Sequence, residues 1–154
     1  QQDAAKGVSE RLRKFEPAKV TVDGVEFLAE PAETKAYEDA LAVFRQGDFA
    51  AAASVFSDFN KRYPRSGYGV ATLFWLGNAQ YANRDYKEAI KNFNALLTRA
   101  PDHARAAESL LSVANCQLEL KDIKAARKTL ADVVKNYPQS EAASAATERL
   151  AKLK

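Results

Sequence analysis

A repeat of 37 residues constrains this chain more than any other feature of its sequence. Pro64, Pro101 and Pro138 follow one another at that interval, in "RYPRS", "RAPDH" and "NYPQS". The same shift aligns small residues with small ones and large apolar residues with large apolar ones: Ala40, Gly77 and Ala114; Ala52, Ala89 and Ala126; Phe56, Phe93 and Leu130. A period of this length is typical of a repeat protein, in which each unit stacks on its neighbours to bury a continuous core.

Each unit is predicted to be a pair of helices. In the first unit Tyr37, Leu41 and Phe44 follow helical spacing. A break falls at "QGDF", "NRDY" and "LKDI", where the Asp can cap the second helix by accepting a backbone N–H. The Pro ends the unit because it has no backbone N–H to donate. We expect Asp102 and Ser140 to cap the helices that follow the second and third Pro.

This pattern predicts an all-α solenoid of three helical hairpins and a C-terminal capping helix, at about 34–64, 68–101, 103–138 and 140–153. Together they form one domain, 34–154. A short N-terminal helix and a further segment precede it in residues 1–33.

The N-terminal segment combines two patterns. Val8, Leu12 and Phe15 form a single apolar seam that suits the tail of a coiled coil. Next, "VTVDGVEF" places Asp-Gly between two alternating runs, which is a strong hairpin signal. A two-residue loop would bring four apolar side chains onto one face, against a neighbour such as the first repeat: Val20, Val22, Val25 and Phe27. The alternative is an extended linker between coiled coil and repeats.

Two unusual residues are explained by packing. Gly77, beside the only Trp at position 75, recurs as a small residue in every unit, so it marks a close helix crossing and Trp75 is assigned to the core. Cys116 aligns with Ala42 and Ala79 and is likewise predicted to be a buried packing residue.

Composition excludes several classes of function. The 23 basic and 20 acidic residues alternate along the chain, which favours solvated helix faces over a nucleic-acid site. With one Cys and one His, neither a metal site nor a nucleophilic triad is indicated, and we expect no cofactor and no enzymatic activity. His103 is expected at a surface loop-to-helix corner. The apolar runs are well short of the roughly 20 residues that cross a bilayer, so no membrane insertion is expected.

The stretch "LFWLGNAQYANRDYKEAIKNFNALLTRAP" resembles a tetratricopeptide repeat. The Leu-Gly pair at 76 and 77, Ala89, Phe93 and Pro101 occupy its motif positions. The units exceed the usual length of about 34 residues by about three, between the Pro and the next Gly position. We expect this to lengthen each first helix by about a turn.

The chain as a whole resembles the C-terminal part of the Tol-Pal system YbgF family, also called the cell division coordinator CpoB family. The resemblance is carried by "RLRKFEPAKVTVDGVEFLAEPAETKAYEDAL", "GYGVATLFWLGNAQYANRDYKEAI" and "NCQLELKDIKAARKTLADVVKNYPQSEAA". It implies a periplasmic protein, made as a precursor with a signal peptide, whose N-terminal coiled coil forms a homotrimer. It also implies that TolA is a partner, together with a bifunctional penicillin-binding protein and other Tol-Pal components. The implied role is to coordinate peptidoglycan synthesis with outer-membrane constriction during cell division.

Two other functions are weighed beside this one. The first is a repeat-type outer-membrane assembly component or co-chaperone that binds a peptide segment. A lipid-anchored component would carry a lipobox Cys, whereas Cys116 lies inside a repeat. The second is an enzyme such as a peptidoglycan hydrolase. The sequence shows no catalytic constellation, which argues against this function.

The tetratricopeptide resemblance also implies a partner-binding groove, because the first helix of each hairpin lines the concave side. Asn78 and Asn115 fall where peptide-binding members keep Asn, whose amide can pair with a peptide backbone. Phe74 and Leu111 stand where a carboxylate-clamp member would have Lys, so the groove should be apolar and should accept a helix or an extended segment. The alternative is that some of these aromatics belong to the core between repeats. The candidate residues are Tyr37, Leu41, Phe44, Arg45, Phe74, Asn78, Tyr81, Leu111, Asn115, Leu118 and Glu119.

Overall fold

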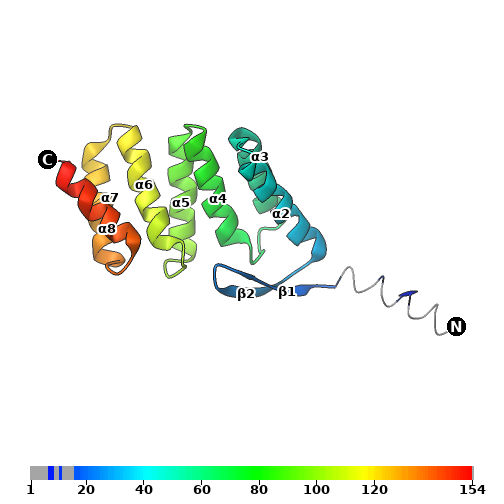
Figure 1. Ribbon diagram of the computed structural model, residues 1–154. Helices are drawn as coiled ribbons and strands as arrows, with labels where there is room; N and C mark the ends of the chain where they lie inside the picture. The colour runs from blue at the N-terminus through cyan, green and yellow to red at the C-terminus, as the bar shows by residue number, and fades with distance from the viewer. Residues whose placement is uncertain (1–6, 9–10, 12–15, 154) are drawn as a thin grey trace.

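A computed structural model describes residues 7–8, 11 and 16–153. A two-stranded hairpin precedes a row of helices (Figure 1). The elements are β1 (Ala18–Val22), β2 (Val25–Ala29), α2 (Pro31–Arg45), α3 (Phe49–Arg62), α4 (Gly69–Ala82), α5 (Tyr86–Arg99), α6 (Ala106–Glu119), α7 (Ile123–Asn136) and α8 (Glu141–Lys152). No helix in the described part of the chain is both long and apolar enough to cross a membrane.

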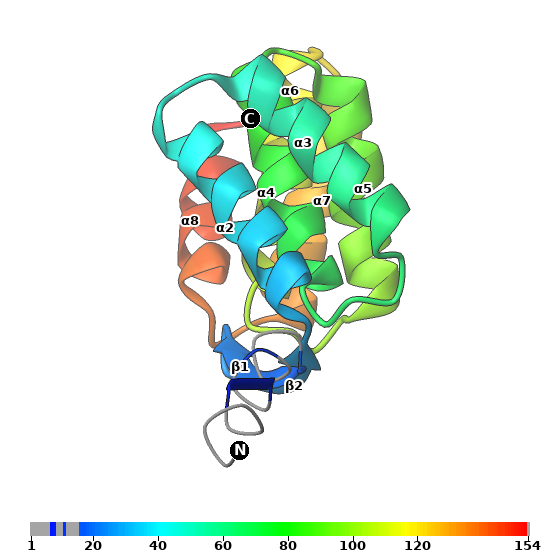
Figure 2. The same ribbon diagram turned by 90° about the vertical axis from the view of Figure 1, so that its right-hand side faces the viewer.

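The helices stack as three antiparallel hairpins and a closing helix, which confirms the predicted fold. Figure 2 shows α3, α5 and α7 on one side of the stack and α2, α4 and α8 on the other. Each helix packs against the next along the chain, and α2 also contacts α4 as α6 contacts α8. The side built from α2, α4, α6 and α8 is called the first-helix face below.

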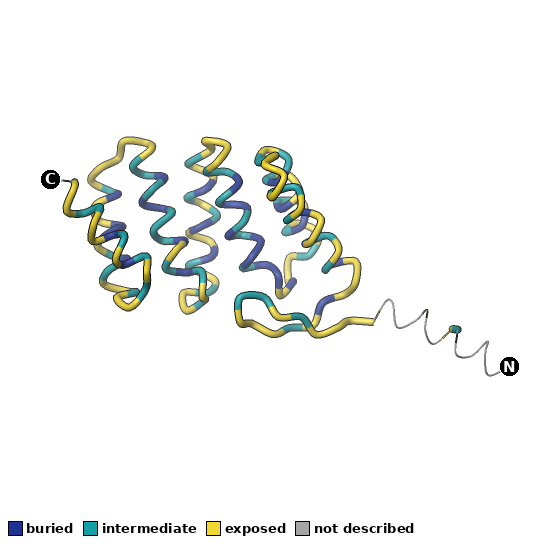
Figure 3. The backbone as a smooth tube through the Cα atoms, in the orientation of Figure 1, coloured by how far each residue is buried: buried dark blue, intermediate teal, exposed yellow. Residues whose placement is uncertain are grey.

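Small and large residues alternate in the core as the repeat predicts. Ala89 and Phe93 are fully buried, as are their equivalents in the other two units. A Cβ on Gly77 would lie 2.7 Å from the Phe93 ring, so Gly77 does mark a close crossing. Helix α4, in the middle of the row, is buried on most of its faces (Figure 3).

The helix caps agree with the sequence in part. Ala51 N–H donates to Asp48, Ala125 N–H donates to Asp122, and Ala143 N–H donates to Ser140. Asp85 stands at the equivalent N-cap position of α5 without making this hydrogen bond.

The expected cap at Asp102 is wrong. Asp102 lies in the turn after Pro101, and α6 begins four residues later with Arg105 at its N-cap. His103 fills this corner instead, because its Nδ1 accepts from Arg105 N–H at 3.0 Å.

The expected lengthening of the first helices is also wrong. Helices α4 and α6 have 14 residues each, the same as α5 and α7. The additional residues form the turns between Pro64 and α4 and between Pro101 and α6.

The N-terminal hairpin is present, so the linker alternative is wrong. Val20 pairs with Phe27 and Val22 with Val25, and both turn residues have positive φ, 51° at Asp23 and 81° at Gly24. The Phe27 ring meets the Tyr68 ring edge-on with centroids 4.8 Å apart, which packs the hairpin against the first repeat.

The described residues include only part of the other N-terminal predictions. Val25 belongs to the predicted apolar face yet is 47% exposed, because it lies beside the turn. Leu12 and Phe15 of the predicted coiled-coil seam lie outside the described residues.

Candidate binding face

Two of the eleven candidate groove residues are buried. Phe74 is 2% exposed and packs against Phe93 with ring centroids 6.3 Å apart, so its assignment to an open groove is wrong. Tyr37 is 6% exposed and stacks on Tyr68 at 4.2 Å. For both, the alternative of core between repeats holds, although an edge of Tyr37 borders a surface pocket.

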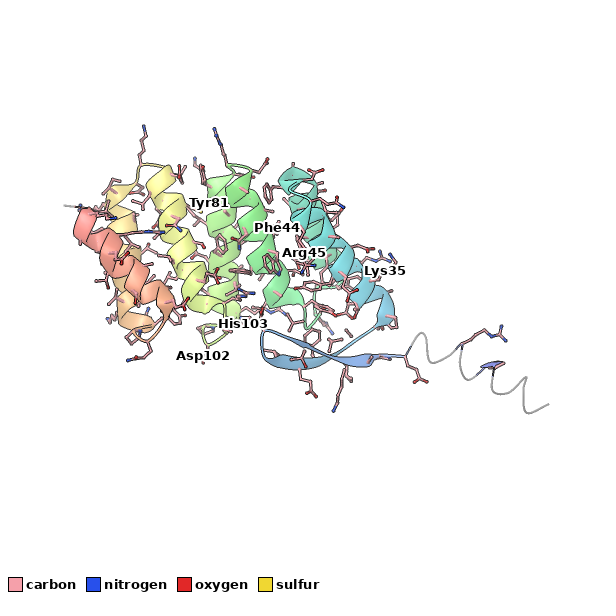
Figure 4. The ribbon with its side chains drawn as sticks, viewed as in Figure 1. Lys35, Phe44, Arg45, Tyr81, Asp102 and His103 are labelled. Atoms are coloured by element: carbon pink, nitrogen blue, oxygen red, sulfur yellow. The ribbon has the colours of Figure 1, made fainter. Side chains whose placement is uncertain are left out.

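The other nine candidates are half-buried or exposed, and they come from α2, α4 and α6. Figure 4 labels Phe44, Arg45 and Tyr81, which lie on the first and second repeats. Arg45 and Glu119 are exposed, and the half-buried members are Leu41, Phe44, Asn78, Tyr81, Leu111, Asn115 and Leu118.

Trp75, which the sequence predicts in the core, packs against the core of two neighbouring units but stays half-buried. Its ring centroid lies 5.3 Å from that of Phe44, and its indole N–H donates to the Tyr37 hydroxyl at 3.2 Å. Trp75 therefore belongs to the first-helix face. The sequence did not distinguish it from the buried Phe74 beside it.

The two candidate amides already have intramolecular partners. Asn78 Nδ2 donates to the Phe74 carbonyl at 2.8 Å, one turn earlier in α4. Asn115 Oδ1 accepts from the Arg149 guanidinium of α8. A partner backbone would pair with the remaining hydrogen-bonding capacity of Asn78 or displace Arg149 from Asn115.

Arg105 connects three parts of the molecule. Its guanidinium lies over the Phe74 ring at 4.8 Å and over the Trp75 ring at 5.6 Å. It also forms ion pairs with Asp23 in the hairpin turn at 3.3 Å and with Glu108 in α6 at 3.4 Å. Sequence reasoning missed Arg105 because its partners in the hairpin and in α4 are distant along the chain.

Two surface pockets lie at opposite ends of the first-helix face. One, of about 560 Å³, is bordered by β1 and α2: Val20, Thr21, Val22, Thr34, Tyr37, Glu38, Leu41, Arg45 and Tyr68. The other, of about 570 Å³, lies between the starts of α6 and α8 and includes Leu111. We call them the β1–α2 pocket and the α6–α8 pocket.

Two observations concern thiol chemistry and metal binding. Cys116 is fully buried, and burial raises the pKa of its thiol to about 12, so the reactive thiolate is disfavoured. Within residues 7–8, 11 and 16–153, no three His, Cys, Asp or Glu side chains are grouped so that they could hold a metal ion. Burial also raises the pKa of the Tyr81 phenol, which therefore stays a neutral hydrogen-bonding group.

The stacked helical hairpins define a tetratricopeptide-type repeat fold, which carries an aromatic, pocketed face on one side. The chain belongs to the YfiO family, described as outer membrane lipoprotein, whose model matches residues 29–154. A comparison with curated proteins gave no match.

Solved structures share the fold at low sequence identity. PcrH from Pseudomonas aeruginosa is 16% identical, with a TM-score of 0.64 over 82% of this chain and 92% of PcrH. PcrH in complex with the chaperone binding region of PopD is 14% identical, with a TM-score of 0.69 over 86% and 96%. The Yersinia enterocolitica type III secretion chaperone SycD, in complex with a peptide of the translocator YopD, is 15% identical, with a TM-score of 0.65 over 81% and 91%.

Proposed function

We propose that this chain is a non-enzymatic binding module of the periplasm that holds a segment of a partner protein on its first-helix face. The observation that carries the proposal is the set of half-buried aromatic and apolar side chains on that face, bounded by a pocket at each end. Similar folds bind partner segments in the PcrH complex with PopD and in the SycD complex with a YopD peptide.

The YfiO family match favours a role in outer-membrane protein assembly, either as an assembly component or as a co-chaperone. In that role the bound segment comes from a client protein that has not yet folded. A strand of an outer-membrane β-barrel alternates apolar and polar residues, so one of its faces can meet an apolar surface while the other stays in water.

A second candidate is the Tol-Pal adaptor that binds TolA during cell division. The observation that favours it is the β1–β2 hairpin. The hairpin covers Ala18–Ala29, and the YfiO match begins only at residue 29. The match therefore does not account for this lead-in, whereas the resemblance to the YbgF family includes it.

Calorimetric titration with two probes tests the proposal. The probes are the soluble periplasmic part of TolA and a synthetic peptide with the alternating pattern of a β-barrel strand. Saturable binding of the peptide alone supports the assembly role, and binding of TolA alone supports the adaptor role. If neither probe binds the folded chain, the proposed function is contradicted.

Two double variants locate the site. The face variant, Leu41→Ala with Tyr81→Ala, removes half-buried side chains from α2 and α4 and should weaken binding at least about tenfold, or 1.4 kcal/mol. Its matched control, Lys87→Ala with Lys91→Ala, alters two exposed residues of α5 on the opposite side and should change affinity less than about twofold. Circular dichroism of both variants verifies that helicity is kept.

A further inference from the structure

We propose that the partner segment binds in an extended conformation, as a third strand added to the free edge of β1. This inference rests on the proposed function and deepens it, because a groove of this fold could also accept a helix. The partner is then recognised through its backbone as well as its side chains.

The pairing register shows which backbone groups of β1 face outward. Asp23 and Gly24 form a two-residue loop, so the closing pair, Val22 and Val25, exchanges hydrogen bonds across the hairpin. Antiparallel pairs alternate, so the next pair, Thr21 and Glu26, does not. The N–H and C=O of Thr21 therefore point away from β2, and those of Lys19, two residues earlier, do the same.

This free edge borders the β1–α2 pocket. Thr21 lines the pocket together with Val20 and Val22, so the β1 strand lies at the pocket rim. No β2 residue lines this pocket, whereas Leu28 of β2 lines a different one beside Pro64. The two sides of the hairpin thus border different pockets, and the β1 side borders the one that includes Leu41 and Arg45 of α2.

The hairpin is held firmly enough to act as a template. Its inner face packs on the first repeat through Phe27 and Tyr68, and its turn is fixed by the ion pair of Asp23 with Arg105. A Cβ on Gly67 would lie 2.2 Å from the Phe27 ring, so this loop also closes tightly over the hairpin. A third strand would meet an edge that needs no ordering, which lowers the entropic cost of binding.

The pocket walls specify the side chains of the added strand. Leu41 offers a half-buried apolar side chain to the residues on one face of an extended chain, above the buried rings of Tyr37 and Tyr68 that border the pocket. Glu38 and Arg45 are exposed on the same wall, and neither forms an ion pair with another described residue. The complementary segment alternates apolar and polar residues and carries a basic residue toward Glu38 and an acidic residue toward Arg45.

A matched pair of proline variants tests the added strand. Thr21→Pro removes the outward N–H of β1 without touching a hydrogen bond of the hairpin. Glu26→Pro removes the corresponding outward N–H of β2, on the opposite edge. We expect Thr21→Pro to weaken binding of the TolA fragment or the β-strand peptide, whichever binds the parent, at least about tenfold, and Glu26→Pro to change it less than about twofold.

Amide hydrogen exchange gives a second readout that needs no substitution. On binding, the amides of Thr21 and Lys19 should gain protection, and those of Glu26 and Leu28 should not. This readout holds even if a proline variant fails to fold.

The outcomes separate this inference from the function on which it rests. Weaker binding by the face variant, together with unchanged affinity of Thr21→Pro and no new protection at Thr21, overturns the added strand and leaves the proposed function standing. Failure of both probes to bind the parent overturns both. A concentration-dependent dimer whose Thr21 amide is protected without any probe would show that a second copy occupies the edge, which also contradicts the inference.

Discussion

The guanidinium of Arg105 and the carboxylate of Asp23 lie 3.3 Å apart, although 82 residues separate them along the chain. This ion pair joins the turn of the N-terminal hairpin to the residue that precedes α6. The hairpin is therefore anchored at both ends, by the pair at its turn and by the direct passage of β2 into α2. The side chains are 32% exposed for Arg105 and 18% for Asp23, so water screens the pair only in part.

Removing this ion pair should destabilise the protein modestly. Asp23→Asn keeps a residue that tolerates the positive φ of the turn, so the loss is mainly electrostatic and should be about 1 kcal/mol. Urea denaturation should show this loss at low salt and a smaller one in 1 M NaCl. The exposed pair of Lys19 and Glu26 serves as control, and Lys19→Gln should change the free energy of unfolding by less than about 0.5 kcal/mol. Equal effects of both substitutions would contradict the anchoring role of Arg105.

Gly77 should not accept a large side chain. Gly77→Leu would place its side chain against the buried Phe93 ring and should cost roughly 1–3 kcal/mol, through strain in the core. Ala82→Leu, at an exposed position of the same helix, should have almost no effect. Thermal melts measure both, and a Gly77→Leu protein that melts within a degree of the parent would disprove the packing at this crossing.

Cys116 should make stability fall at alkaline pH. The folded protein raises the pKa of this thiol from 9.0 to about 12, so between these values the unfolded chain loses a proton that the folded chain keeps. Stability is therefore unaffected by this group below pH 9 and decreases as pH rises toward 12. Because burial also raises the pKa of Tyr37, Tyr68, Tyr81 and Tyr137, Cys116→Ala is compared with the parent, and its loss of stability with pH should be shallower. Identical pH profiles, or rapid labelling of Cys116 by thiol reagents in the folded protein, would refute its burial.

Glycine should be preferred at two turns where the chain has Arg and Lys. Gly47, Arg84 and Lys121 occupy equivalent repeat positions, and all three have positive φ, 83°, 63° and 62°. A side chain in this conformation is strained, so Lys121→Gly should stabilise the protein by about 0.5–1 kcal/mol. As a contrast, Ala131→Gly at an exposed site inside α7 should destabilise it by about 1 kcal/mol. Chemical denaturation measures the free energy of unfolding of both variants. Destabilisation by Lys121→Gly would show that the turn is not strained.

The repeat made the fold predictable because packing acts on every unit in the same way. Equivalent positions such as Ala52, Ala89 and Ala126 must be small in all units, and that requirement is visible in the sequence. The hairpin was also predictable, since Asp23 and Gly24 can adopt the two positive φ angles of its turn.

The candidate site was less predictable because it depends on contacts between units. Phe74 and Trp75 are adjacent, and only the packing of α2 and α5 on α4 decides that Phe74 is buried and Trp75 half-buried. Asp102 looked like a helix cap, but the turn after Pro101 places the start of α6 beyond its reach. Nothing near Arg105 in the sequence indicates its contacts with Asp23 and Phe74.

Hydrogen exchange on the bound protein tests the central claim most directly, because it locates the partner without any substitution. The protein is compared alone and saturated with the probe that binds it, TolA or the β-strand peptide. We predict that the gain in amide protection is concentrated in α2, α4 and α6 and along β1, with little change in α3, α5 and α7. A footprint centred on α3, α5 and α7 would contradict the assignment of partner binding to the first-helix face.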